Sequence, residues 1–452
     1  MIAIGFIVAV IGAFAYATFM GAGPAHLPWA EAVMLIGLFL GFFGAGVHVG
    51  AALGCLGLVA GFLLSDRPFW LYIGQTLWGT STNFVLVSVP LFLLMGEIML
   101  RAGLSGRLYR AMGVWLNRFP GGLLHTNIAS CAVFSAISGS SVATAATMGS
   151  VALPYFRGTH YSPRMVVGSL AAGGALGNLI PPGITFIVYA LITETSVGQL
   201  YVAAIGPSIL VVALFALVIV VHGWRNPAPA GPKATRAEKV QSLFDLIPTL
   251  LLMGLVLGTI YAGVATPTES AAFGVVGAML LAVIERKMNW PLLRDSLVAT
   301  ALATSMIGLI LLGAYLLNFV LASVGVPQAL AQAVGGLPFP PWVLMLFIIG
   351  FYIALGTFME GFSMIVTTIP VIFPLVKALG YDPIWFGVIV TMLVEIAMIS
   401  PPDGTVLYVL QGMRQPAGPI EDVFAGVMPF LAVYILAVLM LLWVPGIALW
   451  LL

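Results

Sequence analysis

Oxygen-bearing side chains gather at four short polar interruptions of an otherwise apolar sequence. Two of them are glycine-containing tips, Ser138–Ser141 (SGSS) and Gly356–Gly361 (GTFMEG). The other two surround double prolines, Asn178–Gly183 (NLIPPG) and Ser400–Gly404 (SPPDG). Proline removes a backbone donor and blocks the carbonyl four residues back, which frees oxygens that can coordinate a small hard cation. One tip with one interrupted helix therefore predicts a cation cage, and the sequence contains this pair twice.

Five acidic residues lie inside apolar runs, where a carboxylate is costly unless it is paired or faces water: Glu97, Glu269, Glu360, Glu395 and Asp403. Glu360 and Asp403 are the strongest site candidates because they stand at a tip and at a break. Glu97 is expected to pair with Arg101 four residues later. Glu269, in ATPTES, is expected to cap the start of its helix through its carboxylate, with Thr266 and Thr268 as neighbours. Glu395 is assigned to neither role.

Simpler structural roles also fit each polar segment taken alone. Double prolines kink helices, and Ser or Thr side chains bond back to their own backbone or fill helix contacts. The recurrence of both features at matched places favours a binding role instead. His48 and His125 are interpreted as hydrogen-bonded packing residues, since neither has an evident carboxylate partner. An intramembrane hydrolase is disfavoured because no HExxH or GxSxG motif occurs.

Composition requires that lipid solvates most of this chain. Of 452 residues, 61% are hydrophobic and 7% charged, and the mean hydropathy is +1.14. The net charge of +1 gives no reason to expect a nucleic-acid partner. The two cysteines form no metal-binding spacing. Residues 1–30 lack a basic n-region and an obvious cleavage site, which predicts an extra transmembrane helix.

An offset of 220 residues, from Pro181 to Pro401, aligns the two halves without gaps. It predicts an all-α polytopic membrane protein built as an inverted-topology repeat, 31–222 and 244–452, joined by a cytoplasmic linker, 223–243. Each half would contain two re-entrant helical hairpin arms and one interrupted helix: 121–156 with 161–192, and 341–374 with 384–410. The remaining predicted helices are 32–48, 50–64, 83–101, 199–222, 244–264, 268–284, 298–322 and 424–452.

Charge asymmetry gives a separate prediction of topology, since Lys and Arg are retained on the cytoplasmic side. Eleven crossings place fourteen basic residues inside and only Arg67 and Lys377 outside, with the N-terminus in and the C-terminus out. Hairpins that span fully would give the same sides, so this rule does not exclude them. The basic and apolar alternation of 105–119 predicts a helix lying flat on the inner surface.

Several segments together resemble the large membrane subunit (DctM) of the tripartite ATP-independent periplasmic transporters. They are VPLFLLMGEIM (89–99), RFPGGLLHTN (118–127), ISGSSVATAATMGSVALP (137–154), GNLIPPGITFIVYA (177–190), ATPTESAAFG (265–274), YDPIWFG (381–387) and SPPDG (400–404). The resemblance implies a bacterial inner-membrane transporter, not an enzyme, that takes up an organic acid, a carboxylate or sulfonate, with sodium by an elevator mechanism. It implies two partners: a soluble periplasmic binding protein and a small four-helix membrane subunit on a separate chain.

The resemblance also implies site residues, with sodium as the coupling ion and no cofactor. One sodium would be held by Ser138, Gly139, Ser140, Ser141, Asn178, Ile180 and Gly183. A second would be held by Gly356, Thr357, Met359, Glu360, Ser400, Pro401, Asp403 and Gly404. Substrate would lie between the tips, at Ser140, Ser141, Thr144, Pro182, Glu360, Gly361, Pro402 and Asp403.

Two positions depart from the family pattern. The family usually has Thr before its second double proline and an apolar residue after it, where this chain has Ser400 and Asp403. Glu360 stands where Asp is more usual. The main alternative function is an organic-anion transporter of similar fold that is proton-coupled or independent of a binding protein.

Overall fold

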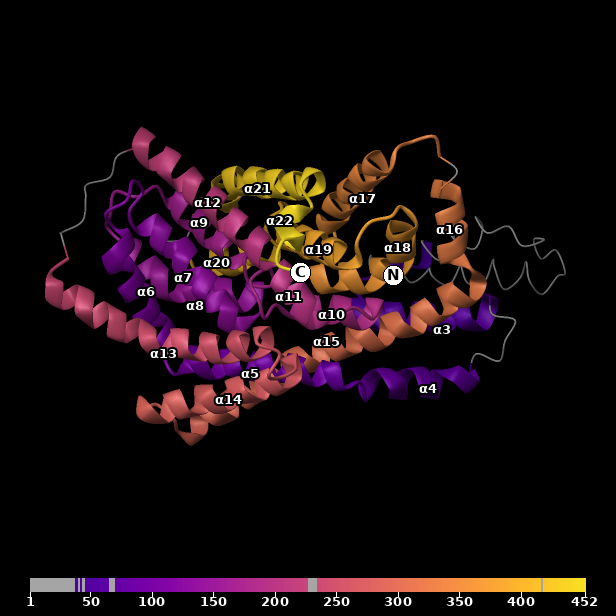
Figure 1. Ribbon diagram of the computed structural model, residues 1–452, viewed down its shortest axis with the longest axis horizontal. Coiled ribbons are helices and arrows are strands. Elements are labelled where there is room, and N and C mark those ends of the chain that lie inside the picture. The colour runs from indigo at the N-terminus through magenta and orange to yellow at the C-terminus, as the bar shows by residue number, and fades with distance from the viewer. Residues whose placement is uncertain are drawn as a thin grey trace. The chain divides into compact units, whose positions relative to one another are not determined.

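The computed structural model describes residues 37–39, 41–42, 45–64, 70–226, 234–335, 337–415 and 418–452 (Figure 1). Its regular elements in these ranges are all helices. Helices satisfy their own backbone hydrogen bonds, as a chain solvated by lipid requires. Much of the predicted helix 32–48 and all of the predicted N-terminal helix 1–30 lie outside the described residues.

Seven described helical stretches are long and apolar enough to cross a membrane: Phe84–Arg101, Val197–Arg225, Arg236–Tyr261, Pro267–Ile284, Trp290–Ser323, Gly361–Ala378 and Ile420–Trp443. Five shorter apolar stretches accompany them: Val49–Phe62, Leu123–Ser138, Ile184–Thr193, Pro341–Gly356 and Pro383–Ile399. Four of these shorter stretches belong to the segments predicted as hairpins or interrupted helices. A full crossing needs about 20 residues, which these stretches do not reach.

The chain forms two compact units, and each draws on both halves of the sequence. The larger unit comprises Phe84–Ala303, Pro341–Met364 and Asp382–Leu452. Its helices are η1 (Phe84–Val87), α5 (Ser88–Arg101), α6 (Leu104–Leu116), α7 (Leu123–Ser138), α8 (Ser141–Ala152), η2 (Leu153–Phe156), α9 (Pro163–Gly174), α10 (Ile184–Thr193), α11 (Val197–Ala203), α12 (Ile205–Arg225), α13 (Arg236–Tyr261), α14 (Pro267–Ile284), α17 (Pro341–Gly356), α19 (Pro383–Ile399), α20 (Thr405–Met413), α21 (Ile420–Trp443) and α22 (Gly446–Leu449).

The smaller unit comprises Met1–Asn83, Thr304–Pro340 and Ile365–Tyr381. It contains α3 (Val49–Leu64), α4 (Trp70–Ser81) and α16 (Val326–Gly335), with most of α15 (Trp290–Val324) and of α18 (Gly361–Ala378). Glycines let α3 approach α15 closely: a Cβ on Gly57 would lie 2.8 Å from the Leu317 nitrogen. The ring of Tyr72 on α4 packs 5.2 Å from that of Phe319 on α15.

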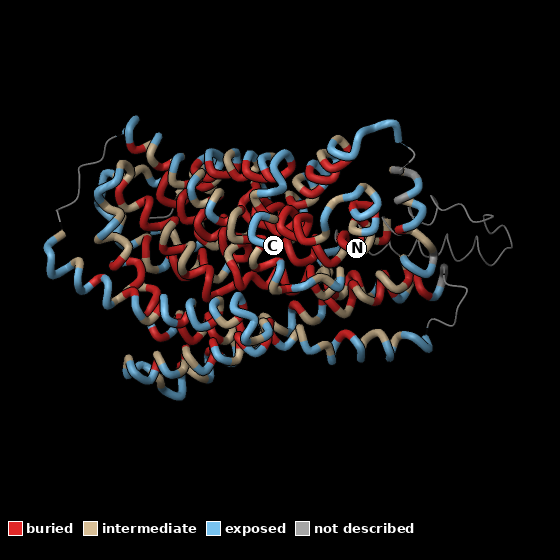
Figure 2. Tube along the Cα trace, viewed as in Figure 1, coloured by how far each residue is buried: buried red, intermediate tan, exposed pale blue. Residues whose placement is uncertain are grey.

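Burial in the larger unit is highest in the helices around the predicted interruptions (Figure 2). Every α19 residue from Ile384 to Ile399 is buried, as is every α9 residue from Met165 to Gly174. By contrast, α13 buries only scattered positions such as Leu252 and Val256. The interrupted helices therefore form the interior of this unit, where non-helical backbone is tolerated.

Some predicted boundaries differ from the structure for local reasons. α13 begins at Arg236, inside the predicted linker, because Thr235 and Glu238 form a reciprocal capping box. The predicted helix 424–452 instead divides into α21 and α22 near Pro445. α4 and α16 have no counterpart among the predicted helices.

Three predicted structural roles are confirmed. Arg101 Nε lies 3.2 Å from Glu97 Oε2. Glu269 Oε2 accepts from the Thr266 backbone nitrogen at 2.8 Å and completes a capping box. His125 Nε2 lies 2.9 Å from the Pro120 carbonyl oxygen, as expected of a packing residue.

Candidate functional site

The tip of the first hairpin is a tight turn between α7 and α8. α7 ends at Ser138, and Gly139 follows with a φ of 58°, in the left-handed region that favours glycine. Ser140 caps α8, with its Oγ 3.5 Å from the Ala143 nitrogen. The Gly139 carbonyl accepts from the Ile184 nitrogen at 3.2 Å, so the tip is bonded to the first turn of α10.

This tip packs against the break of the first interrupted helix. α9 ends at Gly174 and α10 begins at Ile184, and the Pro181–Pro182 bond between them is cis. A Cβ on Gly139 would lie 2.6 Å from the Pro182 carbonyl oxygen, and a Cβ on Gly177 would overlap the Ser141 backbone. The ends of α7, α8, α9 and α10 therefore converge on one place, as the sequence predicts.

A closed ring of hydrogen bonds joins this convergence to α19. Ser141 Oγ donates to Glu395 Oε1 at 2.6 Å, and the Asn178 backbone nitrogen donates to the same oxygen at 2.9 Å. Asn178 Nδ2 donates to Ser141 Oγ at 2.8 Å. Glu395 is 0% exposed, and the other two residues are 1% exposed. A carboxylate from the second half of the sequence thus holds the tip and the break of the first half together.

Two acceptor oxygens of this ring have no hydrogen-bond partner among the described residues. They are Glu395 Oε2 and Asn178 Oδ1, and both are buried. Thr185, the second residue of α10, also has a buried hydroxyl without a hydrogen-bond partner in the described part of the chain. Unpaired acceptors are costly in a buried site, and cations or donors satisfy them.

The remaining first-half candidates have different neighbours. Ser138 Oγ lies 2.6 Å from Thr144 Oγ1, and both side chains are buried, so Thr144 bonds within its own hairpin. A Cβ on Gly183 would overlap the Asn178 carbonyl, which explains the need for glycine there. Ile180 is partly buried and Pro182 is buried beside the tip.

The tip of the second hairpin packs against another face of α19. A Cβ on Gly356, which ends α17, would lie 2.5 Å from Ala397 Cβ, and one on Gly361, which begins α18, would lie 2.5 Å from Val394 Cγ1. Glu360 Oε2 accepts from the Ser363 nitrogen at 3.1 Å and from its hydroxyl at 3.2 Å. Glu360 therefore caps the start of α18. Met359 is buried and Thr357 bonds the Ala354 carbonyl in its own turn.

The second interruption, between α19 and α20, is less enclosed than the first. Ser400 is 4% exposed and donates to the Ile396 carbonyl of its own helix at 2.8 Å. The Pro401–Pro402 bond is cis, and Tyr408 donates to the Pro402 carbonyl at 2.7 Å. Gly404 is buried, whereas Pro401 is partly exposed and Pro402 and Asp403 are exposed. Asp403 has no ion pair or side-chain hydrogen bond among the described residues.

Glu395 is the residue that sequence reasoning left unassigned and the structure places at the centre. It lies on α19 one residue from Val394, which faces the second hairpin, so adjacent positions of one helix serve the two hairpins. Its position in a continuous apolar run just before a double proline could have identified it as a site residue. A carboxylate in such a run is shielded from solvent and needs a polar or cationic partner.

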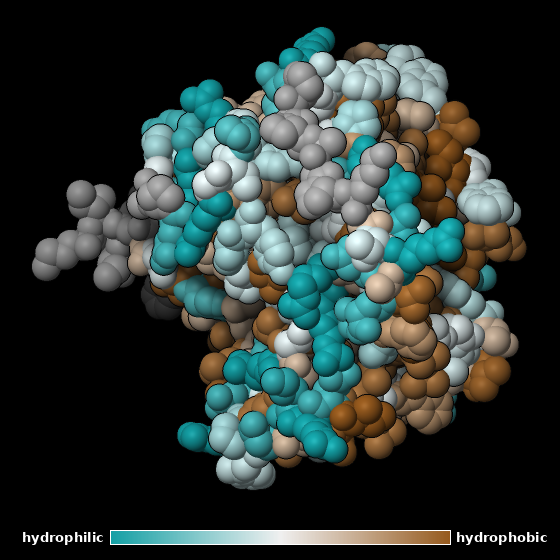
Figure 3. Space-filling view, turned by 90° about the vertical axis from the view of Figure 1, so that its left-hand side faces the viewer, coloured by the Kyte–Doolittle hydropathy of each residue, from teal (hydrophilic) through white to brown (hydrophobic). Residues whose placement is uncertain are grey.

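Figure 3 shows hydrophilic residues clustered beside apolar surface at the end of the larger unit where α6 and the start of α13 lie (Figure 1), and several basic segments belong to this end. Contacts link their segments: Arg107 to Glu285 at 2.6 Å, Arg101 to Asp295 at 3.9 Å, and Arg157 to Gln415 at 3.0 Å. Two cavities open there, of about 520 and 530 Å³. Arg157 and Arg414 line the first; Arg225 and His222 line the second.

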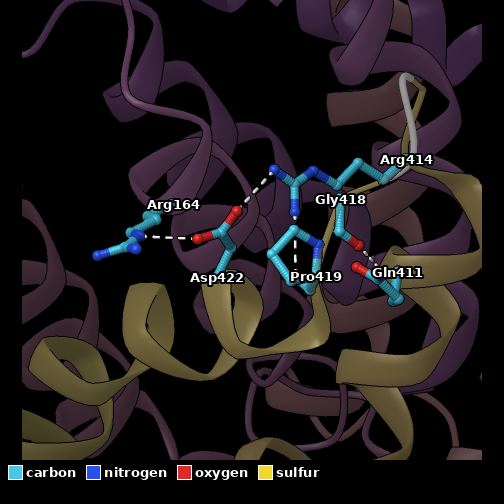
Figure 4. Close-up of polar contacts among 6 residues, drawn as sticks. All are labelled: Arg164, Gln411, Arg414, Gly418, Pro419 and Asp422. Atoms are coloured by element: carbon cyan, nitrogen blue, oxygen red, sulfur yellow. Dashed lines mark hydrogen bonds and ion pairs between the residues drawn. The ribbon is translucent and has the colours of Figure 1, made fainter.

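Asp422 joins three elements at this end (Figure 4). Its Oδ1 lies 2.8 Å from Arg164 Nε at the start of α9, and its Oδ2 lies 3.0 Å from Arg414 Nη2 just after α20. Arg414 also donates to the Pro419 carbonyl at 3.3 Å. The start of α21 is thus tied to the entrance of one interrupted helix and the exit of the other.

Comparison with known families decides what kind of protein holds this site. Residues 36–447 match the family described as "Tripartite ATP-independent periplasmic transporter, DctM component". The chain belongs to this family. It is therefore a multi-pass membrane subunit of a bacterial transporter and not an enzyme, as its sequence predicts.

Individual relatives span most of the chain. The C4-dicarboxylate TRAP transporter large permease protein DctM of Pseudomonas aeruginosa is 33% identical over 374 residues, which are 82% of this chain and 87% of that protein. The sialic acid TRAP transporter large permease protein SiaM of Vibrio cholerae is 30% identical over 395 residues, 87% of this chain and 92% of that protein.

A solved structure shares the fold. The YdaH transporter of Alcanivorax borkumensis aligns with a TM-score of 0.60 at 19% identity, covering 87% of this chain and 96% of that chain. At this identity the likeness concerns the fold alone. It agrees with a helical membrane protein.

Proposed function

We propose that this chain carries a small organic acid, a carboxylate or sulfonate, into the cell together with sodium. The observation that carries the proposal is the convergence of four helix ends, one hairpin tip and one helix break on a buried cluster of oxygen atoms. Non-helical backbone in the interior of a transporter commonly forms the substrate and coupling-ion sites. Relatives named for C4-dicarboxylate and sialic acid, both acids, support this substrate class.

The first sodium is proposed to bind at the first tip and break. The C-terminal ends of α7 and α9 direct their carbonyls and the negative ends of their dipoles there. Hydroxyl, amide and backbone oxygens of Ser138, Gly139, Ser140, Ser141, Asn178, Ile180 and Gly183 are the candidate ligands. These are the hard oxygen donors that a small cation prefers.

The second sodium is proposed to bind at the second tip and break. The candidate ligands are Gly356, Thr357, Met359, Glu360, Ser400, Pro401, Asp403 and Gly404. The C-terminal ends of α17 and α19 supply the matching dipoles. The exposure of Asp403 suits a carboxylate that contacts water when no ion is bound.

The anionic substrate is proposed to lie between the two tips. Helix N-termini offer unpaired backbone N–H groups and a positive dipole end to an anion, and α8, α10, α18 and α20 each begin at a tip or a break. The candidate residues are Ser140, Ser141, Thr144, Pro182, Glu360, Gly361, Pro402 and Asp403. Backbone groups can thus bind the acid without a basic side chain.

The proposed mechanism is an elevator movement of the hairpins and interrupted helices across a stationary scaffold. The chain is proposed to work as an inverted repeat, with re-entrant hairpins, its N-terminus in the cytoplasm and its C-terminus in the periplasm. A separate four-helix membrane subunit and a periplasmic binding protein are the proposed partners. Membership of a tripartite family supports both.

Uptake into proteoliposomes that contain the membrane subunits tests this function. Radiolabelled C4-dicarboxylate and sialic acid serve as probes, with and without the binding protein, under an inward sodium gradient or an inward proton gradient. We expect accumulation only with sodium and the binding protein. Uptake that follows the proton gradient without sodium would establish the proton-coupled alternative instead.

A further inference from the structure

The carboxyl group of Glu395 is buried in the interior of the larger unit, and no basic side chain among the described residues pairs with it. Its carboxyl is 0% exposed, and no Lys, Arg or His nitrogen lies within 4.0 Å of it among the described residues. An isolated buried carboxylate is strongly unfavourable unless something neutralises it. The two donors that reach it, from Ser141 and Asn178, both go to Oε1.

Among the residues that the structure describes, no donor reaches the other oxygen of the carboxyl or the Asn178 amide oxygen. Glu395 Oε2 shares its carboxyl carbon with Oε1, and Asn178 Oδ1 shares its amide carbon with Nδ2, and both Oε1 and Nδ2 belong to the hydrogen-bonded ring. The two unpaired acceptors therefore lie directly beside the ring. Acceptor oxygens without donors, one of them on a carboxyl, form the kind of ligand set that suits a hard monovalent cation.

The matching positions of the second half lack this ring. At the 220-residue offset, Ser141, Asn178 and Glu395 correspond to Gly361, Met398 and Ala175. A Cβ on Gly361 would lie 3.2 Å from Met398 Cε, so an apolar contact stands where the first half has polar ones. The ring is thus a feature of the first site alone and not a general requirement of the tip and break.

We propose that Glu395 completes the first sodium site, with its Oε2 and Asn178 Oδ1 as ligands and its charge balancing the ion. This inference rests on the proposed sodium coupling and deepens it by naming a ligand from the opposite half of the sequence. The ion would then bind the first hairpin, the first break and α19 at once. Sodium occupancy would couple the two halves of the chain.

Sodium-dependent thermal stability of the purified full-length chain tests the proposal, with choline replacing sodium as the reference. Glu395→Gln keeps the acceptor for Ser141 and Asn178 but removes the charge. We expect it to raise the half-saturating sodium concentration by about tenfold or more, as the loss of a charged ligand implies. Thr391→Val is the matched control. Thr391 is buried one turn before Glu395 on α19, and its hydroxyl donates to the Gly387 carbonyl of the same helix.

The outcomes separate this inference from the function on which it rests. A wild-type chain stabilised by sodium, with Glu395→Gln responding at the same concentrations, overturns the ligand assignment and leaves sodium coupling intact. A wild-type chain indifferent to sodium overturns both. If Glu395→Gln does not fold, Glu395→Asp replaces it. That variant keeps the charge but withdraws the oxygen, and an unchanged sodium response would likewise sink the proposal.

Discussion

Three buried polar residues form a series of hydrogen bonds that connects three helices. Tyr109 on α6 donates to Asn127 Oδ1 on α7 at 2.7 Å, and Asn127 Nδ2 donates to Ser169 Oγ on α9 at 2.8 Å. Burial raises the pKa of the Tyr109 phenol well above its usual range, so it remains a donor. Each member is almost fully buried, and removal of one leaves its neighbour unpaired.

Tyr109→Phe should therefore destabilise the protein by about 1–3 kcal/mol, because Asn127 Oδ1 loses its donor in a site without solvent. Chemical denaturation of the purified chain measures this change. Tyr155→Phe is the control, since Tyr155 is 42% exposed and packs beside Tyr109 with its ring 5.2 Å away. Equal stabilities of the two variants would contradict the role given to the Tyr109 hydroxyl.

For single residues, the sequence predicts which chemical groups a site contains better than it predicts which distant residues join that site. SGSS and NLIPPG identify the first tip and break because Gly and Pro act on their own backbone. Glu395 could not be assigned in the same way. Its partners Ser141 and Asn178 lie 254 and 217 residues away, and only the fold brings them together.

Among the helices, the close crossing of α9 and α21 depends on a pair of glycines. α9 and α21 meet where Gly168 lies against Gly426: a Cβ on Gly168 would overlap the Gly426 carbonyl, and one on Gly426 would overlap the Arg164 carbonyl. Backbone atoms cannot move aside as a flexible side chain can. The α9–α21 contact thus holds in place α9, the helix that leads into the first interruption.

Gly168→Ala is expected to lower stability by about 1–3 kcal/mol, the usual cost of overpacking, despite the better helix propensity of Ala. Gly254→Ala on α13 is the matched control, because a Cβ there meets nothing within 4 Å. That control should be neutral or gain up to about 1 kcal/mol. Denaturation midpoints distinguish the variants, and a neutral Gly168→Ala would mean that α9 and α21 are further apart.

Asp422 gives a prediction about how three elements are tied together. Asp422→Asn removes both ion pairs and leaves Arg414, whose side chain is 13% exposed, without its carboxylate partner. It should lower the melting temperature more than Arg164→Gln, which breaks only the pair of a side chain that is 63% exposed. Added salt should reduce the effect of Arg164→Gln further. Equal losses in both variants would argue against a shared role of Asp422.

Local signals explain which elements the sequence predicts and which it does not. Caps such as Thr266 with Glu269 mark helix starts reliably, and both double prolines mark real interruptions. α4 reads WLYIGQTLWGTS, with glycine and several hydroxyl residues and no long apolar run. The ring of Tyr72 on α4 contacts the ring of Phe319 on α15, a partner far along the chain that no local pattern reveals.

The distribution of charge supports a proposal for the orientation of the larger unit in the membrane. Two separate contacts, Arg107 with Glu285 and Arg157 with Gln415, tie basic segments to their neighbours at the basic end of the larger unit. Positively charged segments are retained in the cytoplasm during insertion. This end is therefore proposed to face the cytoplasm, and α21, which begins there, would lead the C-terminus to the other side.

Cysteine labelling of intact cells tests that orientation. In a background with Cys55 and Cys131 replaced by Ala, Asn226→Cys and Leu452→Cys each place one exposed thiol just beyond α12 and at the C-terminus. A membrane-impermeant maleimide should label Leu452→Cys in intact cells and Asn226→Cys only after permeabilisation. The opposite pattern would invert the topology. It would also place the basic end and its two cavities outside, against the charge bias that the two halves share.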